Sequence, residues 1–389
     1  MKLERFLNPE ERLLVGCTKC FLEPSLDLGK IVSHENFDWE KVYEIACRHG
    51  VVPILGHWIH EFEGDPVPEK VRQKIQKRNF HNLQKNLLLT MEMSKIEKIL
   101  ESEGIPVAAF KGPVLAEWAY GNVGLREFVD LDLVVPDSKF ALLAKNVLIS
   151  RGYHLDYDLN PALETHFLRT QCEYHLFSPD RKTFIEIHWK IFHDYFSFPF
   201  SISDAWRRMI HVKVLERDQL SFSPEDSILI LCAHATKHTW SRMIWIIDIA
   251  LLIRKNPGID WNRLLGSAEA LGSKRMLFFG LYLVEKLFGL SFPQNLKDKI
   301  NGDVTLNSLG KMVFRQWRRK ATEKVDFRFE LKFLLKSRER LSDRLRFLFL
   351  GTIIPSASDF SGTSNLGIPL SLYYLWRPIR LLRRFLGNF

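Results

Sequence analysis

The sequence predicts an α/β protein, with a small mixed sheet in the middle of the chain and helices before and after it. Residues 1–95 carry apolar side chains at three- and four-residue spacing, which is typical of amphipathic helices. Residues 96–220 hold short apolar or alternating runs, which are typical of strands. Helical spacing returns over residues 221–389. We therefore expect an N-terminal helical domain, an α/β core and a C-terminal helical domain over these three ranges.

Composition narrows the class of protein. A chain of 389 residues with 46% hydrophobic residues suits a globular protein of two or three domains. The net charge of +9 favours anionic partners such as nucleotides, nucleic acid or an acidic membrane surface, without choosing among them. The chain opens without a signal-peptide pattern, and no apolar stretch reaches the ~20 residues of a membrane span. Five irregularly spaced cysteines argue against a disulfide framework, so we expect a cytoplasmic protein.

The first elements are predicted from local patterns. "DWEKVYEIACRHGVVPILGHWI" and "NLQKNLLLTMEMSKIEKILESEG" have helical apolar spacing, and the second segment ends at Gly104, a residue type that commonly caps helices. "PVAAF" is short and apolar, as expected of a buried strand. The predicted secondary structure therefore changes from helix to strand just after Gly104.

The middle of the chain alternates between strands and helices. A helix is expected from Gly112-Pro113 to Tyr120, because proline is favoured at the first helical position. "EFVDLDLVV" reads as a strand and "KFALLAKNVLIS" as a helix, and "YHLDY" is a candidate strand. "CEYHLFSPDRKTFIEIHWKI" predicts a hairpin around the turn "SPDRK". These elements make up the predicted sheet.

The C-terminal segment reads as helical up to about residue 350. "SPED" begins it with an N-cap serine, Ser223, followed by proline and two acids in the first turn. Residues 228–253, "ILILCAHATKHTWSRMIWIIDIALLI", are expected to form one helix. "SASDFSGTSNLG" reads as a loop, and the tail "LYYLWRPIRLLRRFLGNF" is basic and amphipathic. The tail suggests a peripheral contact with a membrane or another subunit.

Three acidic residues are the strongest candidates for chemistry. Asp130 and Asp132 lie two residues apart on an apolar strand, so both side chains point to one face. Like charges side by side repel, and a divalent cation is the simplest compensation. Glu186 lies between two isoleucines on a later strand. Three carboxylates on adjacent strands would hold Mg²⁺, with Mn²⁺ as the alternative, whereas the competing interpretation is a solvent-facing polar edge.

Residues near these acids suit phosphate binding. Lys111 and Gly112 lie where a strand meets a helix N-terminus, whose free N–H groups and dipole favour phosphate. Glycine at this position lets a phosphate approach the backbone closely. Arg126 lies four residues before Asp130, where it could either clamp phosphate or pair with an aspartate.

Histidines and a polar stripe complete the candidate site. His188 lies on the same strand face as Glu186 and either lines a cleft or is structural. At ~100° per residue, a stripe of polar residues covers about one third of the predicted helix 228–253. The stripe consists of His234, His238, Arg242, Trp245 and Asp248. It indicates contacts with substrate or nucleotide, or alternatively a structural hydrogen-bond network.

The order of these blocks resembles the nucleotidyltransferase superfamily with the DNA polymerase β-like fold. More closely, "FKGPVLAEWAYGNVGLREFVDLDLVV", "IEIHW" and "HATKHTWSRMIWIIDIALLI" look like the bacterial family of uncharacterised nucleotidyltransferases, over most of the chain. The resemblance implies that Asp130 and Asp132 are the metal-binding pair and Glu186 the third carboxylate. Lys111 and Gly112 stand where the superfamily has a glycine-serine phosphate loop, and the gap from Gly112 to Asp130 is longer than usual.

The resemblance implies a Mg²⁺-dependent enzyme that transfers NMP from an NTP, ATP included, to an unidentified acceptor and releases pyrophosphate. A small molecule, a peptide or a glycan precursor would serve as acceptor. The positive charge leaves a nucleic-acid acceptor open as well, although no RNA- or DNA-binding module is recognisable. Two alternatives remain open. One is a non-catalytic nucleotide-binding or scaffold protein. The other is a related transferase of phosphoryl or sugar-phosphate groups onto a peptide or polysaccharide precursor.

Overall fold

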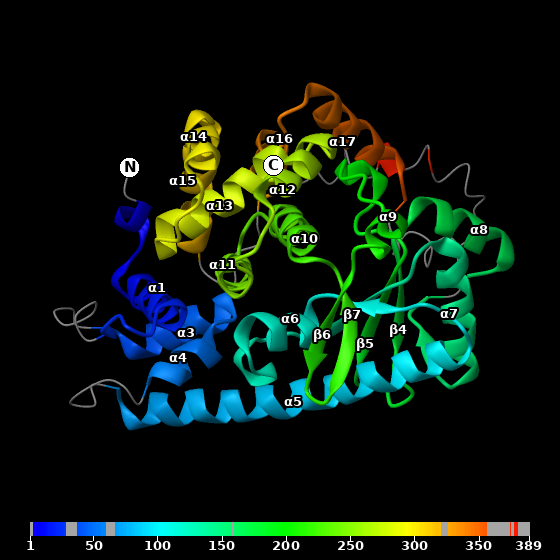
Figure 1. Cartoon of the computed structure of the whole chain (residues 1–389), viewed down its shortest axis with the longest axis horizontal. Helices are drawn as coiled ribbons and strands as arrows, with labels where there is room; N and C mark the ends of the chain where they lie inside the picture. The colour runs from blue at the N-terminus through cyan, green and yellow to red at the C-terminus, as the bar shows by residue number, and fades with distance from the viewer. Residues whose placement is uncertain are drawn as a thin grey trace.

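The structure is a computed structural model that describes residues 3–28, 37–59, 67–157, 159–319, 326–355, 374 and 377–379. Within these ranges a sheet lies beside a large group of helices, and one long helix, α5 (Glu69–Ser102), runs beneath both (Figure 1). The mixed α/β class expected from the sequence is confirmed.

The main sheet has five strands in the order β1-β2-β5-β4-β3. Its strands are β1 (Ala108–Ala109), β2 (Asp130–Val134), β3 (His154–Leu155), β4 (Glu173–Phe177) and β5 (Phe184–His188). β2 and β5 are parallel, and every other pair in the sheet is antiparallel. The hairpin expected around "SPDRK" is confirmed as β4 and β5.

A second, two-stranded sheet was not expected from the sequence. It consists of β6 (Ile210–Val214) and β7 (Arg217–Ser221), paired antiparallel. Both strands alternate between buried and more exposed side chains, as a sheet with one covered face requires. β7 contacts β1, so this ribbon packs beside the edge of the main sheet.

The N-terminal segment is helical, as expected. Its elements are η1 (Leu3–Phe6), α1 (Pro9–Leu22), α3 (Trp39–His49), α4 (Val52–Trp58) and α5. Asn8 caps α1 by accepting the N–H of Glu11, whose carboxylate accepts the N–H of Asn8 in return. α5 ends at Ser102, and Gly104 follows at φ +70°, a left-handed conformation that favours glycine. The predicted end of this helix is therefore confirmed.

Short helices connect the strands of the core. They are α6 (Gly112–Leu115), η2 (Ala116–Tyr120), η3 (Val123–Leu125), α7 (Ser138–Ser150), α8 (Pro161–Thr170), η4 (Asp194–Phe196) and α9 (Ile202–Trp206). The helix predicted to begin at Gly112-Pro113 is confirmed, and its second half is π-helical. Asp137 caps α7 by accepting the N–H groups of Lys139 and Phe140.

Helices make up the described C-terminal part. They are α10 (Pro224–Lys237), α11 (Ile244–Lys255), α12 (Trp261–Ala270), α13 (Lys274–Phe288), α14 (Gln294–Gly302), α15 (Thr305–Trp317), α16 (Phe327–Lys336) and α17 (Leu341–Ile353). No helix in the described ranges is both long and apolar enough to cross a membrane. The predicted loop over 356–367 and most of the basic tail lie outside the described residues, so the proposed tail contacts stay predictions.

The single helix expected over residues 228–253 is wrong. α10 ends at Lys237, and Thr239 and Trp240 have φ of 54° and 53° before α11 begins at Ile244. Tertiary packing holds this break, because Trp240 is fully buried and its carbonyl accepts the indole N–H of Trp317 at 2.9 Å. A partner 77 residues away thus overrides the local helical pattern.

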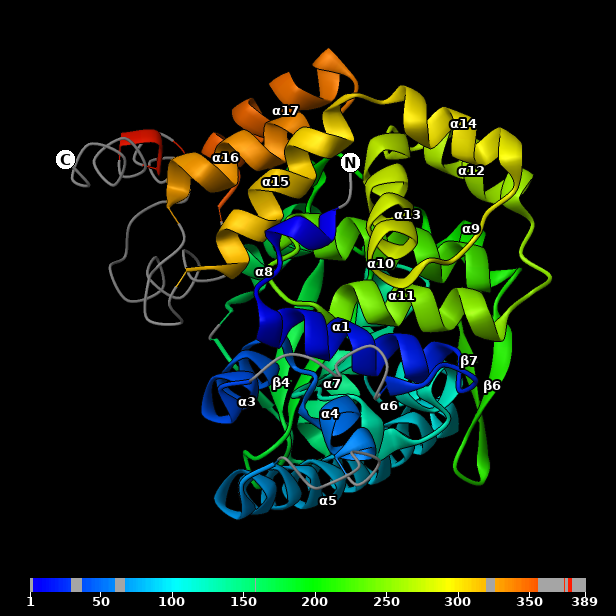
Figure 2. The same cartoon turned by 90° about the vertical axis from the view of Figure 1, so that its left-hand side faces the viewer.

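The N-terminal and C-terminal helices share one hydrophobic core. α1 contacts α11 and α13, and Figure 2 shows α1 lying alongside α11. A second core lies between the main sheet, α7 and the C-terminal half of α5. The two helical segments therefore form one body around the shared core. The boundary at residue 95 falls inside α5, which contacts α3 and α4 as well as α7.

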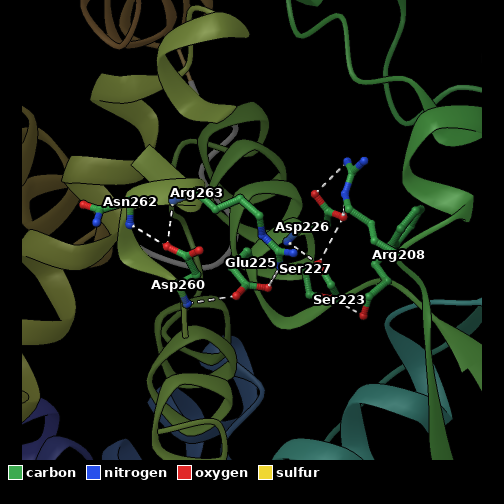
Figure 3. Close-up of polar contacts among 9 residues, drawn as sticks. Arg208, Ser223, Glu225, Asp226, Ser227, Asp260, Asn262 and Arg263 are labelled. Carbon is green, nitrogen blue, oxygen red and sulfur yellow. Dashed lines mark hydrogen bonds and ion pairs between the residues drawn. The ribbon is translucent and has the colours of Figure 1, made fainter. Parts of the chain in front are cut away.

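Polar contacts fix the start of α10, as Figure 3 shows. Ser223 accepts the N–H of Asp226 and so caps the helix, as the "SPED" pattern predicts. The Asp226 carboxylate accepts two hydrogen bonds from Arg208, at 2.6 and 3.0 Å. Glu225 pairs with Arg263 of α12. With its first turn held in this way, α10 places His234 of its last turn, and His238 just after its end, beside a pocket that Asp130 and Glu186 also line.

Candidate functional site

The polar face of the main sheet brings the predicted carboxylates together. Asp132 lies directly opposite Glu186 on the parallel pair β2 and β5, and Glu186 lies opposite His175 on β4. Residues opposite one another on neighbouring strands point to the same face. Asp130 is two residues before Asp132 and shares that face. The predicted common face of the three acids is thus observed.

Two further residues of this face were missed from the sequence. Glu173 lies opposite His188, and His175 lies between Glu186 and the sheet edge. Their signal was the alternation in "EYHLF", which places Glu173 and His175 on one face of β4. Only the hairpin register shows that this face adjoins Glu186.

His188 lies at the centre of the cluster. Its Nε2 atom is 3.3 Å from Asp132 Oδ1 and 3.2 Å from Glu186 Oε2, and its Nδ1 atom is 2.9 Å from Glu173 Oε2. Burial opposes a charged imidazole, but the nearby carboxylates raise the pKa of His188 well above its usual range. His188 is therefore cationic at neutral pH and offsets part of the negative charge.

Lys111 supplies a second cation. Its Nζ atom lies 2.5 Å from Asp132 Oδ1. Burial would lower the pKa of Lys111, but Asp132, Glu186 and Asp130 raise it above the usual value. Gly112 follows at φ +42°, and a Cβ atom there would lie 3.5 Å from the backbone oxygen of Asp130. A Cβ atom would therefore fit there, and it is the left-handed backbone at the start of α6 that favours glycine.

The two aspartates differ in their acidity. Burial would raise the pKa of Asp132, but Lys111 and His188 outweigh it and lower this pKa to about 2. Burial and the Asp132 charge raise the pKa of Asp130 to about 6. Asp132 is therefore a firmly ionised carboxylate at neutral pH, whereas the ionised form of Asp130 is held at a free-energy cost.

Among the described residues, two sets could hold a metal ion. Asp132, Glu186 and His188 form one set, and Glu173, His175 and Glu186 form the other, with ligand atoms within 4.8 Å of one another in each set. The contacts of His188 and of Asp132 Oδ1 in this cluster are close ion pairs without hydrogen-bond geometry. Carboxylate oxygens are the ligands that Mg²⁺ prefers, and an imidazole that has lost its proton also suits Mn²⁺. The residues present thus fit a divalent cation.

A cavity of about 680 Å³ opens beside the two aspartates. α5 forms one wall, and the end of α10 with the start of α11 forms another. Cationic side chains dominate the lining: Lys74, Lys77, Arg78, Lys85, Lys111, Arg126 and Arg242. The cavity therefore joins a cationic wall to the carboxylates of the sheet, as binding of a polyanion would require.

The predicted polar stripe is partly brought together, although it spans two helices. His234, His238, Arg242 and Trp245 all line the cavity. Burial, together with the charges of nearby lysines, lowers the pKa of both histidines. The pKa of His238 falls to about 4. Both imidazoles are therefore neutral at neutral pH and can donate or accept hydrogen bonds.

The expected role of Asp248 in contacting substrate is corrected by the structure. Asp248 is fully buried, and it accepts hydrogen bonds from Arg126 Nε and Nη2 at 2.8 and 2.9 Å and from the Tyr120 hydroxyl at 2.6 Å. Arg126 accordingly pairs with Asp248 and not with Asp130 or Asp132. Because α11 begins anew after the turn, its Asp248 face meets Tyr120 and Arg126 behind the cavity wall.

Comparison with known proteins defines the family. Residues 35–289 match the family described as uncharacterised nucleotidyltransferase, which is well over half of the chain. The chain belongs to this family. The match includes the nucleotidyltransferase sheet, the cluster around Asp132 and the cavity wall up to α11.

Among solved structures, the chain is similar to an antigenic nucleotidyltransferase-like protein from Paracoccidioides brasiliensis. The identity is 15%, and the alignment covers 54% of this chain and 95% of the other, with a TM-score of 0.30. No curated protein matches the chain.

Proposed function

We propose that the protein is a metal-dependent enzyme that transfers NMP from an NTP to an acceptor and releases pyrophosphate. Membership of the nucleotidyltransferase family supports nucleotide chemistry in general. The observation that carries the proposal is the pairing of Asp132 with Glu186 on adjacent parallel strands, beside a cavity with a cationic wall. Carboxylates for a metal and cations for phosphates are what nucleotidyl transfer requires.

The proposed metal ligands are Asp130, Asp132 and Glu186. Mg²⁺, or alternatively Mn²⁺, would neutralise the triphosphate and orient the reacting oxygens there. Lys111 and the backbone of Gly112 would contact the phosphates at the start of α6. Asp248 accepts hydrogen bonds from Nε and Nη2 of Arg126. These bonds hold the guanidinium rigidly at the cavity wall as a fixed positive charge.

In the proposed reaction an acceptor oxygen or nitrogen forms a bond to the α-phosphorus. The bond between this phosphorus and the oxygen that bridges to the β-phosphate breaks, and pyrophosphate leaves with the bonding electron pair. Glu186 is partly exposed on the sheet face and would accept the proton of the acceptor. The neutral His234 and His238 imidazoles and the Trp245 ring would contact the base or the acceptor.

We expect each NTP that serves as substrate to bind far more tightly with Mg²⁺ than without it, and Asp132→Asn to abolish this Mg²⁺-dependent gain in affinity. An asparagine at this position would be a neutral, weaker ligand for a hard cation. The measurement is calorimetric titration of the four NTPs, with and without Mg²⁺. Asp218→Asn is the matched control, because Asp218 is an exposed aspartate on a strand outside the site.

Failure of all four NTPs to bind, or equal binding by the folded Asp132→Asn variant, would contradict the proposal. NTP binding that Mg²⁺ does not strengthen would instead favour the non-catalytic nucleotide-binding alternative. Once an acceptor is known, release of pyrophosphate distinguishes nucleotidyl transfer from a phosphoryl transfer that releases the nucleoside diphosphate.

A further inference from the structure

The cations of the cavity differ in whether an acid neutralises them. Four of them have a carboxylate partner within the described part of the chain. Lys111 and Arg126 pair with Asp132 and Asp248, as described above. Arg78 donates two hydrogen bonds to Glu127, at 2.8 and 3.0 Å, and Lys74 Nζ lies 2.5 Å from Glu40. These pairs leave the cavity with positive charge that is not cancelled.

Lys85 and Arg242 both line this cavity without such a partner. No carboxylate of the described residues lies within 4.0 Å of either charged group. Both side chains are partly buried, and the Nε atom of Arg242 is buried without a hydrogen-bond partner. Burial lowers the pKa of both groups, the Glu127 carboxylate partly offsets this for each of them, and the Arg78 and Arg242 charges lower the pKa of Lys85 further.

The backbone is shaped to accommodate Arg242. Gly50 ends α3 at φ +71°, and a Cβ atom there would come within 2.5 Å of Arg242 Nη2. The absence of a side chain at Gly50 therefore leaves room for the guanidinium against the backbone. His49, its neighbour, is fully buried, and its Nδ1 atom accepts the N–H of Met243 at 3.1 Å. These contacts hold the turn that carries Arg242.

Two partly buried like charges that form no ion pair are unfavourable for folding, even with the Glu127 carboxylate nearby. Such an arrangement is typical of a site whose ligand supplies the missing charge. A phosphate-type oxyanion accepts several charge-assisted hydrogen bonds, and an arginine with a lysine can supply them.

We propose that Lys85 and Arg242 form a subsite for a phosphate-type oxyanion that binds without a metal ion, apart from the carboxylates of the sheet. The subsite is supported by the finding that Lys85 and Arg242 line the cavity without forming ion pairs with any described residue. Its place in the reaction rests on the proposed function. The anion is then either the triphosphate of the NTP or an anionic group on the acceptor.

The test titrates inorganic tripolyphosphate into the full chain by calorimetry, at low ionic strength and with a chelator present. The wild type binds, and Lys85→Met and Arg242→Gln each bind about tenfold to a hundredfold more weakly, because each removes charge-assisted hydrogen bonds. Lys85→Arg keeps the charge and retains binding. Lys98→Met is the control, because Lys98 is an exposed lysine on the same helix outside the cavity.

Melting temperatures exclude a merely structural role. Lys85→Met and Arg242→Gln melt at or above the wild-type temperature, because each removes a partly buried charge that forms no ion pair within the described part of the chain. Absence of tripolyphosphate binding by the wild type, or equal binding by both variants, would overturn the subsite.

Competition separates the two sources of the anion. If tripolyphosphate displaces a bound NTP·Mg²⁺, the subsite holds the nucleotide triphosphate. If both bind together, it holds the anionic group of the acceptor. Failure of the proposed function would be seen in a separate measurement, as equal NTP binding by the wild type and Asp132→Asn. That outcome would leave the tripolyphosphate result unchanged.

Discussion

Asp130→Asn is expected to raise the melting temperature at pH 7.5 while abolishing Mg²⁺-dependent nucleotide binding. Burial and the Asp132 charge hold the pKa of Asp130 at about 6, above its ordinary value, so the ionised carboxylate destabilises the fold. Neutral asparagine removes this free-energy cost of folding, which we place at about 1–2 kcal/mol after allowing for solvent screening. The lost metal ligand should weaken nucleotide binding or turnover by about a thousandfold, which corresponds to several kcal/mol.

The gain in stability should depend on pH. A carboxyl group whose pKa is raised in the folded state contributes stability that is full below its unfolded pKa, near 3.8, and is lost as pH rises through about 6. The difference in melting temperature between Asp130→Asn and the wild type should therefore grow from pH 4.5 to pH 7.5. Asp218→Asn, on the exposed part of β7, should show no such growth. A variant that melts below the wild type at pH 7.5, or that keeps metal-dependent binding, would contradict the assignment.

Asp248→Asn is expected to destabilise the fold by about 3–5 kcal/mol, because Arg126 would be left buried without its counter-charge. Arg126 and Asp248 are 6% and 0% exposed, and both guanidinium contacts are shorter than 3.0 Å. The measurement is the shift of the urea unfolding midpoint, read at constant slope.

Two further variants make this second prediction specific. Arg126→Met/Asp248→Leu removes both charges and should recover most of the lost stability. Glu103→Gln breaks an ion pair of 3.1 Å with Arg151 whose side chains are both about half exposed, so its effect should stay below about 1 kcal/mol. If Asp248→Asn lost no more unfolding free energy than Glu103→Gln, the buried pair of Arg126 and Asp248 would not hold α11 against the core.

Features set by local patterns were predictable from the sequence. Alternation places Asp130 and Asp132 on one face whatever the rest of the fold does. Pro113 marks the start of α6, and "SPDRK" marks the turn that sets Glu186 two strands from the sheet edge. The candidate carboxylates therefore follow from rules that act over a few residues.

Features set by distant contacts were not predictable in the same way. The break after Lys237 depends on packing and hydrogen bonding of Trp240 with residues far along the chain. Helical periodicity identifies the helix that carries Lys85 but does not show which of its faces lines the cavity. The shared core of the N-terminal and C-terminal helices likewise depends on tertiary packing, and the predicted boundary at residue 95 falls inside α5.

The most direct test of the central claim is a crystal structure with Mn²⁺ and a non-hydrolysable analogue of the NTP that binds best in calorimetry. Anomalous scattering locates Mn²⁺ independently of the protein atoms. The account predicts a peak bound directly to the carboxylates of Asp130, Asp132 and Glu186 and to the triphosphate, which extends into the cavity lined by α5. Nucleotide bound elsewhere, or a triphosphate in the cavity with no metal at these carboxylates, would contradict it.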